Sequence, residues 1–237
     1  IDIEKVKKSG LPLLDLDEEI LPMDSRYYLA LLEYFEKENL DALGIQCVPD
    51  IPNLFNHWPY AVFARLADEG RAICMEGDVD GALCALIGEY LGLGPCYLSD
   101  WAEHSNQTVT LWHAGTLPFT FSPPFESKQG PRIANHFIDG RPAVIESTIK
   151  EGMRLTIYRI WRLNGTYFMM AHHAESIKPK RHIKGTNGLI RLIDEDPEKL
   201  ITRLIYRGMP HHIAVVRGDH VELFKQFAEL MDIQWVH

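Results

Sequence analysis

The stretch that decides the fold class is residues 72–100, AICMEGDVDGALCALIGEYLGLGPCYLSD. It begins with a short apolar run at 72–75, continues with a helical pattern from about residue 80 to 91, and ends in a second apolar run at 96–99. Short apolar runs separated by a helix of this length indicate parallel strands joined by a helical crossover. The stretch therefore predicts a parallel α/β sheet in this part of the chain.

The same alternation extends towards the N-terminus. The spacing of apolar residues predicts helices at about 25–39, with Ser25 as the N-cap, and at about 59–68. An apolar run at 41–48 predicts a strand between these helices. Residues 1–25 lack a sustained period, so they are expected to form an entry segment or a linker.

Beyond residue 100 the sequence becomes rich in β-formers. Runs at 108–112 and 154–161 have strand character, and Asn164-Gly165 is a strong signal for a hairpin turn. These runs predict mostly antiparallel pairing. The predicted organisation is an α/β domain at residues 1–100, followed by a β-rich domain at residues 101–237.

Composition limits the classes of partner. The 237 residues carry a formal net charge of −9, and the sequence pI is near 5.6. Binding to DNA or RNA needs a basic footprint, so a nucleic acid is not an expected partner. Apolar residues make up 46% of the chain, but the sequence has no run of about 18 apolar residues that could span a bilayer. A globular protein that does not bind membranes is therefore expected.

Basic residues and cysteines add two further expectations. Residues 128–184 hold eleven Lys and Arg against four acids, which a solvated face or a subunit contact explains better than a phosphate site. The four cysteines, Cys47, Cys74, Cys84 and Cys96, form no Cys-x-x-Cys pair, so neither a zinc knuckle nor a redox motif is indicated. Buried free thiols and a cytoplasmic location are expected instead.

Glu76 and Asp100 are the first candidates for chemistry, because each follows one of the apolar runs of the opening stretch. If those runs are neighbouring parallel strands, both carboxylates lie at the carboxyl edge of one sheet, where open α/β folds bind ligands. Two converging carboxylates can hold a divalent metal or move protons. For each acid taken alone, surface solvation or helix capping remains the alternative.

The residues around Glu76 superficially match the start of a calcium loop, with further acids at Asp78 and Asp80 and a glycine at position 81. The match fails at the last ligand position, Ile87, where a bidentate glutamate is needed. Asp78 or Asp80 is therefore assigned to capping the helix that follows. Glu76 precedes this helix and is free to point into a cleft.

Several histidines could supply a nitrogen ligand. His211 and His212 precede an apolar strand near the end of the chain, and we expect only one of them to join a site because neighbouring residues in an extended segment face opposite ways. His113 ends a predicted strand, and it either faces the cleft or lies in the core. The pair His172-His173 is a weaker candidate.

Three familiar motifs are absent from the sequence: the Gly-x-Ser-x-Gly elbow, the Gly-x-Gly-x-x-Gly turn and the Gly-Lys-Ser/Thr phosphate loop. Their absence argues against classical hydrolases, dinucleotide-binding enzymes and nucleoside triphosphatases.

Four segments together resemble the metal-dependent L-fucose and L-arabinose isomerases, and specifically the L-fucose isomerase-like branch. They are residues 42–49 (ALGIQCVP), 74–83 (CMEGDVDGAL), 98–100 (LSD) and 209–216 (MPHHIAVV). The 24-residue spacing from Glu76 to Asp100 also agrees with that family. Members of the family are longer, and this chain begins at Ile1 rather than Met, so it is expected to be the C-terminal half of a longer enzyme.

The resemblance implies a fold and a metal site. A parallel α/β region would be followed by an antiparallel, barrel-like domain. The metal would be Mn²⁺, with Mg²⁺ or Co²⁺ as alternatives, and its ligands would be Glu76, Asp100 and His212. Oxygen ligands with one imidazole suit these metals better than metals that prefer thiolates. Gln46, His113 and His211 are the residues expected to bind substrate.

The resemblance also implies the reaction, which is interconversion of an aldose with its ketose through a metal-stabilised enediolate. Glu76 and Asp100 would combine ligation with proton transfer between C1 and C2 of a small neutral sugar, in a homo-oligomer. Two alternatives stay open. One is a non-catalytic sugar-binding module on the same scaffold, and the other is a metal-dependent aldolase or lyase.

Overall fold

The computed structural model describes residues 2–237. Its smaller sheet has two parallel strands, β1 (Ala42–Gly44) and β2 (Ala72–Cys74). β2 lies at the start of residues 72–100. The chain crosses from β1 to β2 through α3 (Asp50–Phe55) and α4 (Tyr60–Asp68). The predicted helix at 59–68 and the parallel pairing of these two strands are both confirmed.

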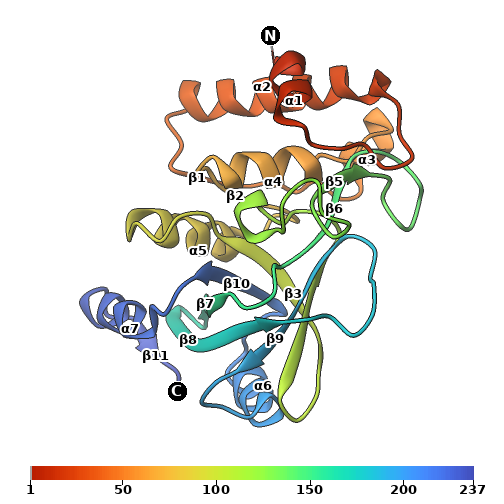
Figure 1. Cartoon of the computed structure of the whole chain (residues 1–237). Coiled ribbons are helices and arrows are strands. Elements are labelled where there is room, and N and C mark those ends of the chain that lie inside the picture. The colour runs from red at the N-terminus through yellow and green to blue at the C-terminus, as the bar shows by residue number, and fades with distance from the viewer. Residues whose placement is uncertain (1) are drawn as a thin grey trace.

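Helices cover the small sheet. α2 (Leu21–Lys37) packs on α4, and both helices lie above the small sheet in Figure 1. α5 (Val79–Tyr90) lies between the small sheet and the larger sheet that follows it in the chain. α5 is apolar on most sides because it contacts β1 and β2 on one side and strands of the larger sheet on the other. It is the element that joins the two sheets.

The larger sheet closes into a six-stranded antiparallel barrel. Its strands pair in the order β8, β7, β10, β3, β4, β9, and β9 pairs again with β8. The strands are β3 (Tyr97–His104), β4 (Thr108–His113), β7 (Arg154–Leu163), β8 (Thr166–Ile177), β9 (Thr186–Leu192) and β10 (His212–Arg217). A small parallel sheet joined to an antiparallel barrel confirms the predicted fold class.

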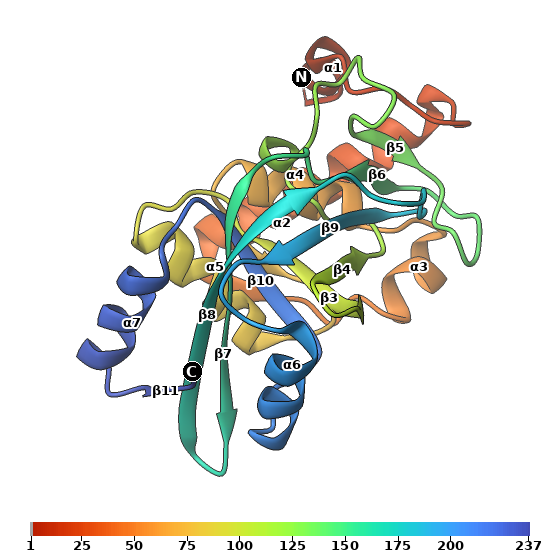
Figure 2. The same ribbon diagram turned by 60° about the horizontal axis from the view of Figure 1, so that its bottom comes forward.

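Three short strands extend the barrel sheet. β6 (Val144–Thr148) pairs in parallel with β9, β5 (Arg132–Ala134) pairs with β6, and β11 (Gln234–Trp235) runs parallel to β8. The long β7–β8 hairpin stands out in Figure 2. Its turn is Asn164-Gly165, where both residues have positive φ values of 52° and 83°, as the Asn-Gly signal predicted.

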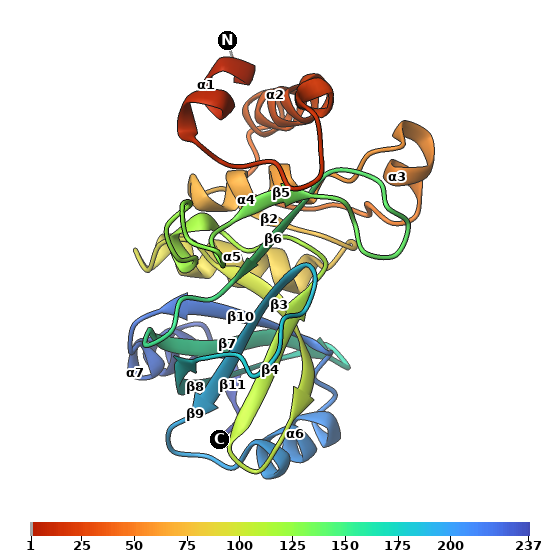
Figure 3. The ribbon, with the colours of Figure 1, turned by 45° about the vertical axis from the view of Figure 1, so that its right-hand side comes forward.

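Strand alternation separates the inside of the barrel from its outer face. Residues such as Val109, Leu111 and Ile213 point inward and are fully buried. α6 (Pro197–Tyr206) adds the buried side chains of Leu200 and Leu204 to the same core, and it lies at the end of the molecule opposite the N-terminal helices (Figure 3). The outer face of β10 packs against α5, and α7 (Val221–Leu230) covers β8.

The N-terminal segment is folded rather than a linker. It forms α1 (Asp2–Ser9), a short 3₁₀ turn (Glu18–Ile20) and the first turns of α2, while a second 3₁₀ turn (Phe119–Phe121) follows β4. The Arg65 guanidinium donates two hydrogen bonds, of 3.0 and 2.6 Å, to the Asp2 carboxylate. This ion pair ties α1 to α4, a contact that no local pattern in residues 1–25 indicates.

The predicted relation between β2 and β3 is wrong. β2 pairs with β1 in the small sheet, whereas β3 is antiparallel to β4 and β10 in the barrel. α5 therefore leads from one sheet to the other instead of returning to the same sheet. β3 also continues past Asp100 to His104, so Asp100 lies inside a strand and the domain boundary proposed after residue 100 falls within β3.

Two expectations from composition can be compared with the structure. All four cysteines are buried and free, as expected. Among residues 2–237, no helix is long and apolar enough to cross a membrane.

His172 on β8 is expected to make the fold less stable in mild acid. Burial lowers the pKa of His172 from 6.5 to about 4, with the Glu195 carboxylate opposing the shift and Arg203 adding to it. The folded protein then binds this proton more weakly than the unfolded chain does. Stability should therefore fall, by on the order of 1–3 kcal/mol, as the pH drops from about 6.5 towards 4.

Urea unfolding at a series of pH values would measure this effect. His172→Gln should reduce the acid-induced loss, and the part that remains comes from other buried histidines such as His113, whereas the exposed His104→Gln should leave the loss unchanged. An unchanged pH slope in His172→Gln would contradict the assignment.

Candidate functional site

Asp100 and His212 face each other across two neighbouring strands. They are directly paired in the antiparallel register of β3 and β10, so their side chains project from the same face of the sheet. His212 Nε2 lies 3.4 Å from Asp100 Oδ1. Both atoms are buried, and neither has a hydrogen-bond partner among residues 2–237. Buried polar atoms are nearly always satisfied, so this pair needs a further partner, either an ordered water or a ligand.

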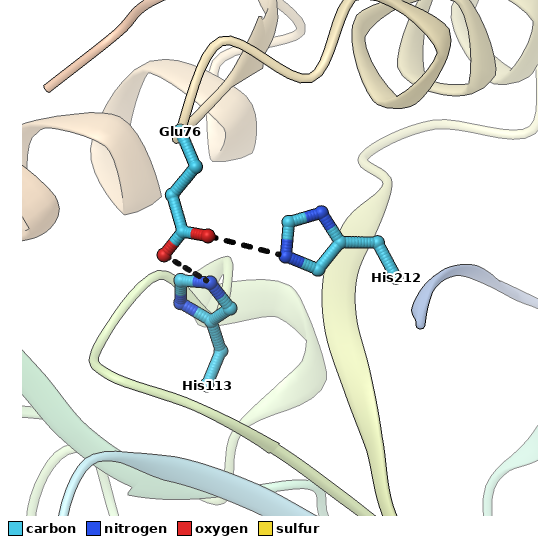
Figure 4. Close-up of side chains that lie close together, drawn as sticks. All are labelled: Glu76, His113 and His212. Atoms are coloured by element: carbon cyan, nitrogen blue, oxygen red, sulfur yellow. Dashed lines mark ion pairs between the residues drawn. The ribbon is translucent and has the colours of Figure 1, made fainter. Parts of the chain in front are cut away.

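Glu76 reaches the same imidazole from the other sheet. It lies in the loop between β2 and α5 with a positive φ of 61°, a conformation that non-glycine residues rarely adopt and that is concentrated at functional sites. Its Oε2 lies 3.6 Å from His212 Nε2, and its Oε1 lies 3.7 Å from His113 Nε2 (Figure 4). The structure therefore brings His212 Nε2 close to both Glu76 and Asp100, although not at one sheet edge; among the described residues, the groups of donor atoms within 4.8 Å of one another contain either Glu76 or Asp100, and none contains both.

Asp78 orients His212 from behind. It accepts a 2.8 Å hydrogen bond from His212 Nδ1 and two bonds, of 2.8 and 2.7 Å, from the buried Arg159 guanidinium on β7. Burial alone would raise the pKa of Asp78, but the bonds from His212 and Arg159 outweigh it and hold the pKa well below its usual value. Asp78 is thus ionised and can only accept from His212, so in the neutral form of the imidazole the proton lies on Nδ1 and the Nε2 lone pair points towards Glu76 and Asp100.

The role of Asp78 was only half predicted. It is the N-cap of α5 and accepts a 2.8 Å bond from the Gly81 amide, as one of the two assignments expected. Its contacts with His212 and Arg159 were missed, because both partners lie far away in the sequence. One signal was present: Arg159 is a charged residue between the apolar pairs at 157–158 and 160–161 of β7.

Electrostatics favour a cation beside Asp100. Burial raises the pKa of Asp100, the nearby His212 and His211 lower it, and Glu76 raises it further. The Glu76 carboxylate thus adds to the effect of burial in disfavouring the ionised state of Asp100. A bound cation would relieve this repulsion and occupy the unpartnered atoms.

The donor set fits a divalent metal. In the part of the chain that the structure describes, donor atoms within 4.8 Å of one another form two groups that share His212: Glu76 with His113, and Asp100 with His211. Ligands at right angles around an ion with bonds of about 2.1–2.4 Å lie about 3.0–3.4 Å apart, close to the spacings found here. Carboxylate oxygens with imidazole nitrogen suit Mn²⁺, Mg²⁺ or Co²⁺.

The three residues predicted to bind substrate occupy different positions. His113 is buried with its ring 5.6 Å from that of Tyr60, and burial lowers its pKa to about 3, so it is a neutral imidazole at the floor of the site. Gln46 lies beside the Glu76 loop, where its Oε1 would be 2.7 Å from a Cβ added to Gly77. Its amide nitrogen donates to the Val48 carbonyl, and Gln46 makes no hydrogen bond with Glu76, Asp100 or His212.

His211 lies closer to the cluster of Glu76, Asp100 and His212 than the alternation of side chains along a strand predicted. Its Nε2 also lies 3.4 Å from Asp100 Oδ1, and its ring centre lies 4.4 Å from that of His212. β10 begins at His212, so His211 is outside the strand and need not face the opposite way. His211 is 70% exposed, which leaves it accessible to a ligand.

The chain was compared with known protein families and with curated proteins. No protein-family model matches the chain. The chain is similar to three curated proteins named sulfoquinovose isomerase, with 23% identity over 235 residues to the one from Alkalicoccus urumqiensis, and 21% over 236 residues to those from Priestia aryabhattai and Priestia megaterium. The alignments cover 98% of this chain and 52% of each relative, so the chain spans about half the length of the curated relatives it matches. The names of these relatives support a carbohydrate isomerase as the class of relative, and they do not single out the L-fucose isomerase-like branch.

Proposed function

We propose that the chain is the metal-binding part of a sugar isomerase that interconverts an aldose and its ketose. One observation carries the proposal: two buried, unpartnered donor atoms, Asp100 Oδ1 and His212 Nε2, face each other 3.4 Å apart, with the Glu76 carboxylate beside them. The names of the relatives support the reaction class.

Glu76, Asp100 and His212 would hold a divalent ion, with Mn²⁺ as the first choice. When bound, the ion would supply an electrophile for the sugar carbonyl and the adjacent hydroxyl. His212 is held in one tautomer by Asp78, so its contribution is a fixed nitrogen donor.

Proton transfer between C1 and C2 needs a carboxylate that the sugar can reach. The Glu76 side chain is 39% exposed and that of Asp100 is 23% exposed, so Glu76 is the more accessible. We assign the proton transfer to Glu76, while Asp100 and His212 would hold the ion that would polarise the substrate oxygens. Homo-oligomer formation and a cytoplasmic location stay predictions.

Two kinds of sugar substrate are considered, a neutral sugar and an acidic one. The resemblance to L-fucose isomerases favours a neutral sugar. A specific observation favours an acidic one: the loop from β8 to β9 carries Lys178, Lys180, Arg181 and Lys184, and its Lys184 carbonyl accepts a 2.7 Å bond from Trp112, which is paired with Asp100. Two hollows of about 240 and 170 Å³ share Lys180 and Arg181 of this loop, but neither is lined by Glu76, Asp100 or His212.

The test is isomerisation of an aldose panel that includes neutral sugars, such as L-fucose and L-arabinose, and a sulfonated sugar, such as sulfoquinovose. The chain, stripped of metal and resupplied with Mn²⁺, should convert at least one of them to its ketose. Turnover that survives complete metal removal would contradict the metal-dependent reaction. Metal-dependent sugar binding without conversion would favour the non-catalytic module instead.

A further inference from the structure

We propose that Trp112 and Phe137 form an aromatic wall against which the C–H face of the sugar stacks while its oxygens face Glu76, Asp100 and His212. This inference rests on the proposed function and identifies how the same site would bind the carbon side of its substrate. Sugar-binding pockets combine a few placed polar groups with apolar and aromatic walls.

Trp112 is positioned beside the cluster by strand register. It pairs directly with Asp100 across β3 and β4, so the two side chains project from the same face. Its neighbour Leu111 points into the barrel, which places the indole on the outer face next to Asp100. The indole Nε1 donates a 2.7 Å bond to the Lys184 carbonyl. The polar edge of the ring is therefore satisfied, and the ring is fixed in one orientation.

Phe137 stands against this indole from a different segment. The two rings meet edge to face, with centres 5.2 Å apart and planes at 87°. Phe137 is 42% exposed although it is large and apolar. Single exposed apolar residues are ordinary, but this one contacts the half-buried Trp112 next to the cluster. The two rings together offer an apolar corner rather than an isolated exposed ring.

The loop that carries Phe137 is well anchored. His136 stacks on Trp58 with ring centres 3.9 Å apart, and the Trp58 indole donates to both oxygens of Asp139, each at 3.1 Å. The His136 amide also donates a 2.8 Å bond to the Arg141 carbonyl. These contacts on either side of Phe137 restrict its position, so little ordering is needed when a ligand binds.

His113 connects the wall to the donor atoms. The Trp112 and His113 rings are nearly parallel, at 24° with centres 6.4 Å apart, and His113 Nε2 lies 3.7 Å from Glu76 Oε1. The apolar corner is therefore continuous with the polar cluster. A sugar seated on it would present one face to aromatic carbon and its oxygens to the carboxylates.

The test compares sugar binding and Mn²⁺ binding in four variants of the full chain. By calorimetry with L-fucose, L-arabinose and sulfoquinovose, Trp112→Ala and Phe137→Ala should weaken binding of the accepted sugar by about 5- to 10-fold. Trp112→Phe, which keeps an aromatic face, should lose about 2- to 3-fold. The control Tyr206→Ala, which removes an 86% exposed ring on α6, should bind as the unaltered chain does. Mn²⁺ affinity should stay unchanged in all four, which also reports that the fold is intact.

The outcomes separate this inference from the proposed function. Unaltered sugar affinity in both Phe137→Ala and Trp112→Phe, with Mn²⁺ still bound, would overturn the wall and leave the isomerase proposal standing. If the unaltered chain binds Mn²⁺ but none of the three sugars, both proposals are overturned. Loss of sugar affinity in Phe137→Ala with normal Mn²⁺ affinity supports the wall.

Discussion

Replacing His212 with glutamine is expected to lower the affinity for Mn²⁺ by at least about 100-fold and to abolish metal-dependent isomerisation. Outer-shell partners of metal ligands already contribute about 10- to 100-fold, and the ligand itself should contribute no less. His212 Nε2 lies within 3.6 Å of a donor oxygen of Glu76 and of Asp100. Glutamine has a similar size but offers no imidazole lone pair, so the loss should reflect ligation rather than packing.

Calorimetric titration with Mn²⁺ measures this effect directly. His104→Gln is the matched control, because it removes an exposed imidazole from β3 and should leave both affinity and turnover unchanged. A metal ligand should cost at least about 100-fold in affinity when it is replaced. If His212→Gln keeps its Mn²⁺ affinity within about threefold, His212 is not a metal ligand.

Replacing Arg159 with methionine is expected to destabilise the fold by about 3–5 kcal/mol, because it leaves a buried carboxylate without its charged partner. Arg159 is 1% exposed, and the Asp78 side chain that it holds is 15% exposed. The same change should weaken Mn²⁺ binding, since Asp78 would lose the partner that fixes it against His212. Urea unfolding at neutral pH measures the first effect, and Mn²⁺ titration measures the second.

Two comparisons isolate the buried pair. Adding Asp78→Asn to Arg159→Met should recover part of the lost stability, because asparagine removes the unpaired charge and keeps the N-cap bond to Gly81. Arg191→Met breaks a pair with Glu175 at the same 2.8 Å distance, but these side chains are 51% and 32% exposed, so it should cost less than about 1 kcal/mol. Similar losses in Arg159→Met and Arg191→Met would contradict the structural role of Arg159.

Local patterns predicted the elements whose stability is local. The helix at 59–68 and the Asn164-Gly165 hairpin carry their own periodicity or turn chemistry, and the structure has both. α1 was missed because its ion pair from Asp2 to Arg65 spans 63 residues, which no window of sequence can display. The predicted relation between β2 and β3 was wrong for the same reason. An apolar run predicts a strand, but it does not indicate the sheet in which that strand pairs.

In the candidate site, too, sequence patterns identified residues but not the contacts that position them. Glu76 and Asp100 were chosen as acids that follow apolar runs, and the structure does bring both to His212, yet by a different route from the predicted one. Asp100 is positioned by its register with β10, and Glu76 by a positive φ in the loop before α5. Trp112 gave no signal of its own, because its place beside Asp100 depends on strand pairing and not on any motif.

The central claim is that Glu76, Asp100 and His212 hold one divalent ion, and the location of Mn²⁺ in crystals of the chain tests it most directly. The anomalous signal of Mn²⁺ should give a peak within about 2.0–2.4 Å of a carboxylate oxygen of Glu76, of Asp100 Oδ1 and of His212 Nε2. A peak at another set of side chains, or no peak at a Mn²⁺ concentration that saturates binding in solution, would contradict the claim.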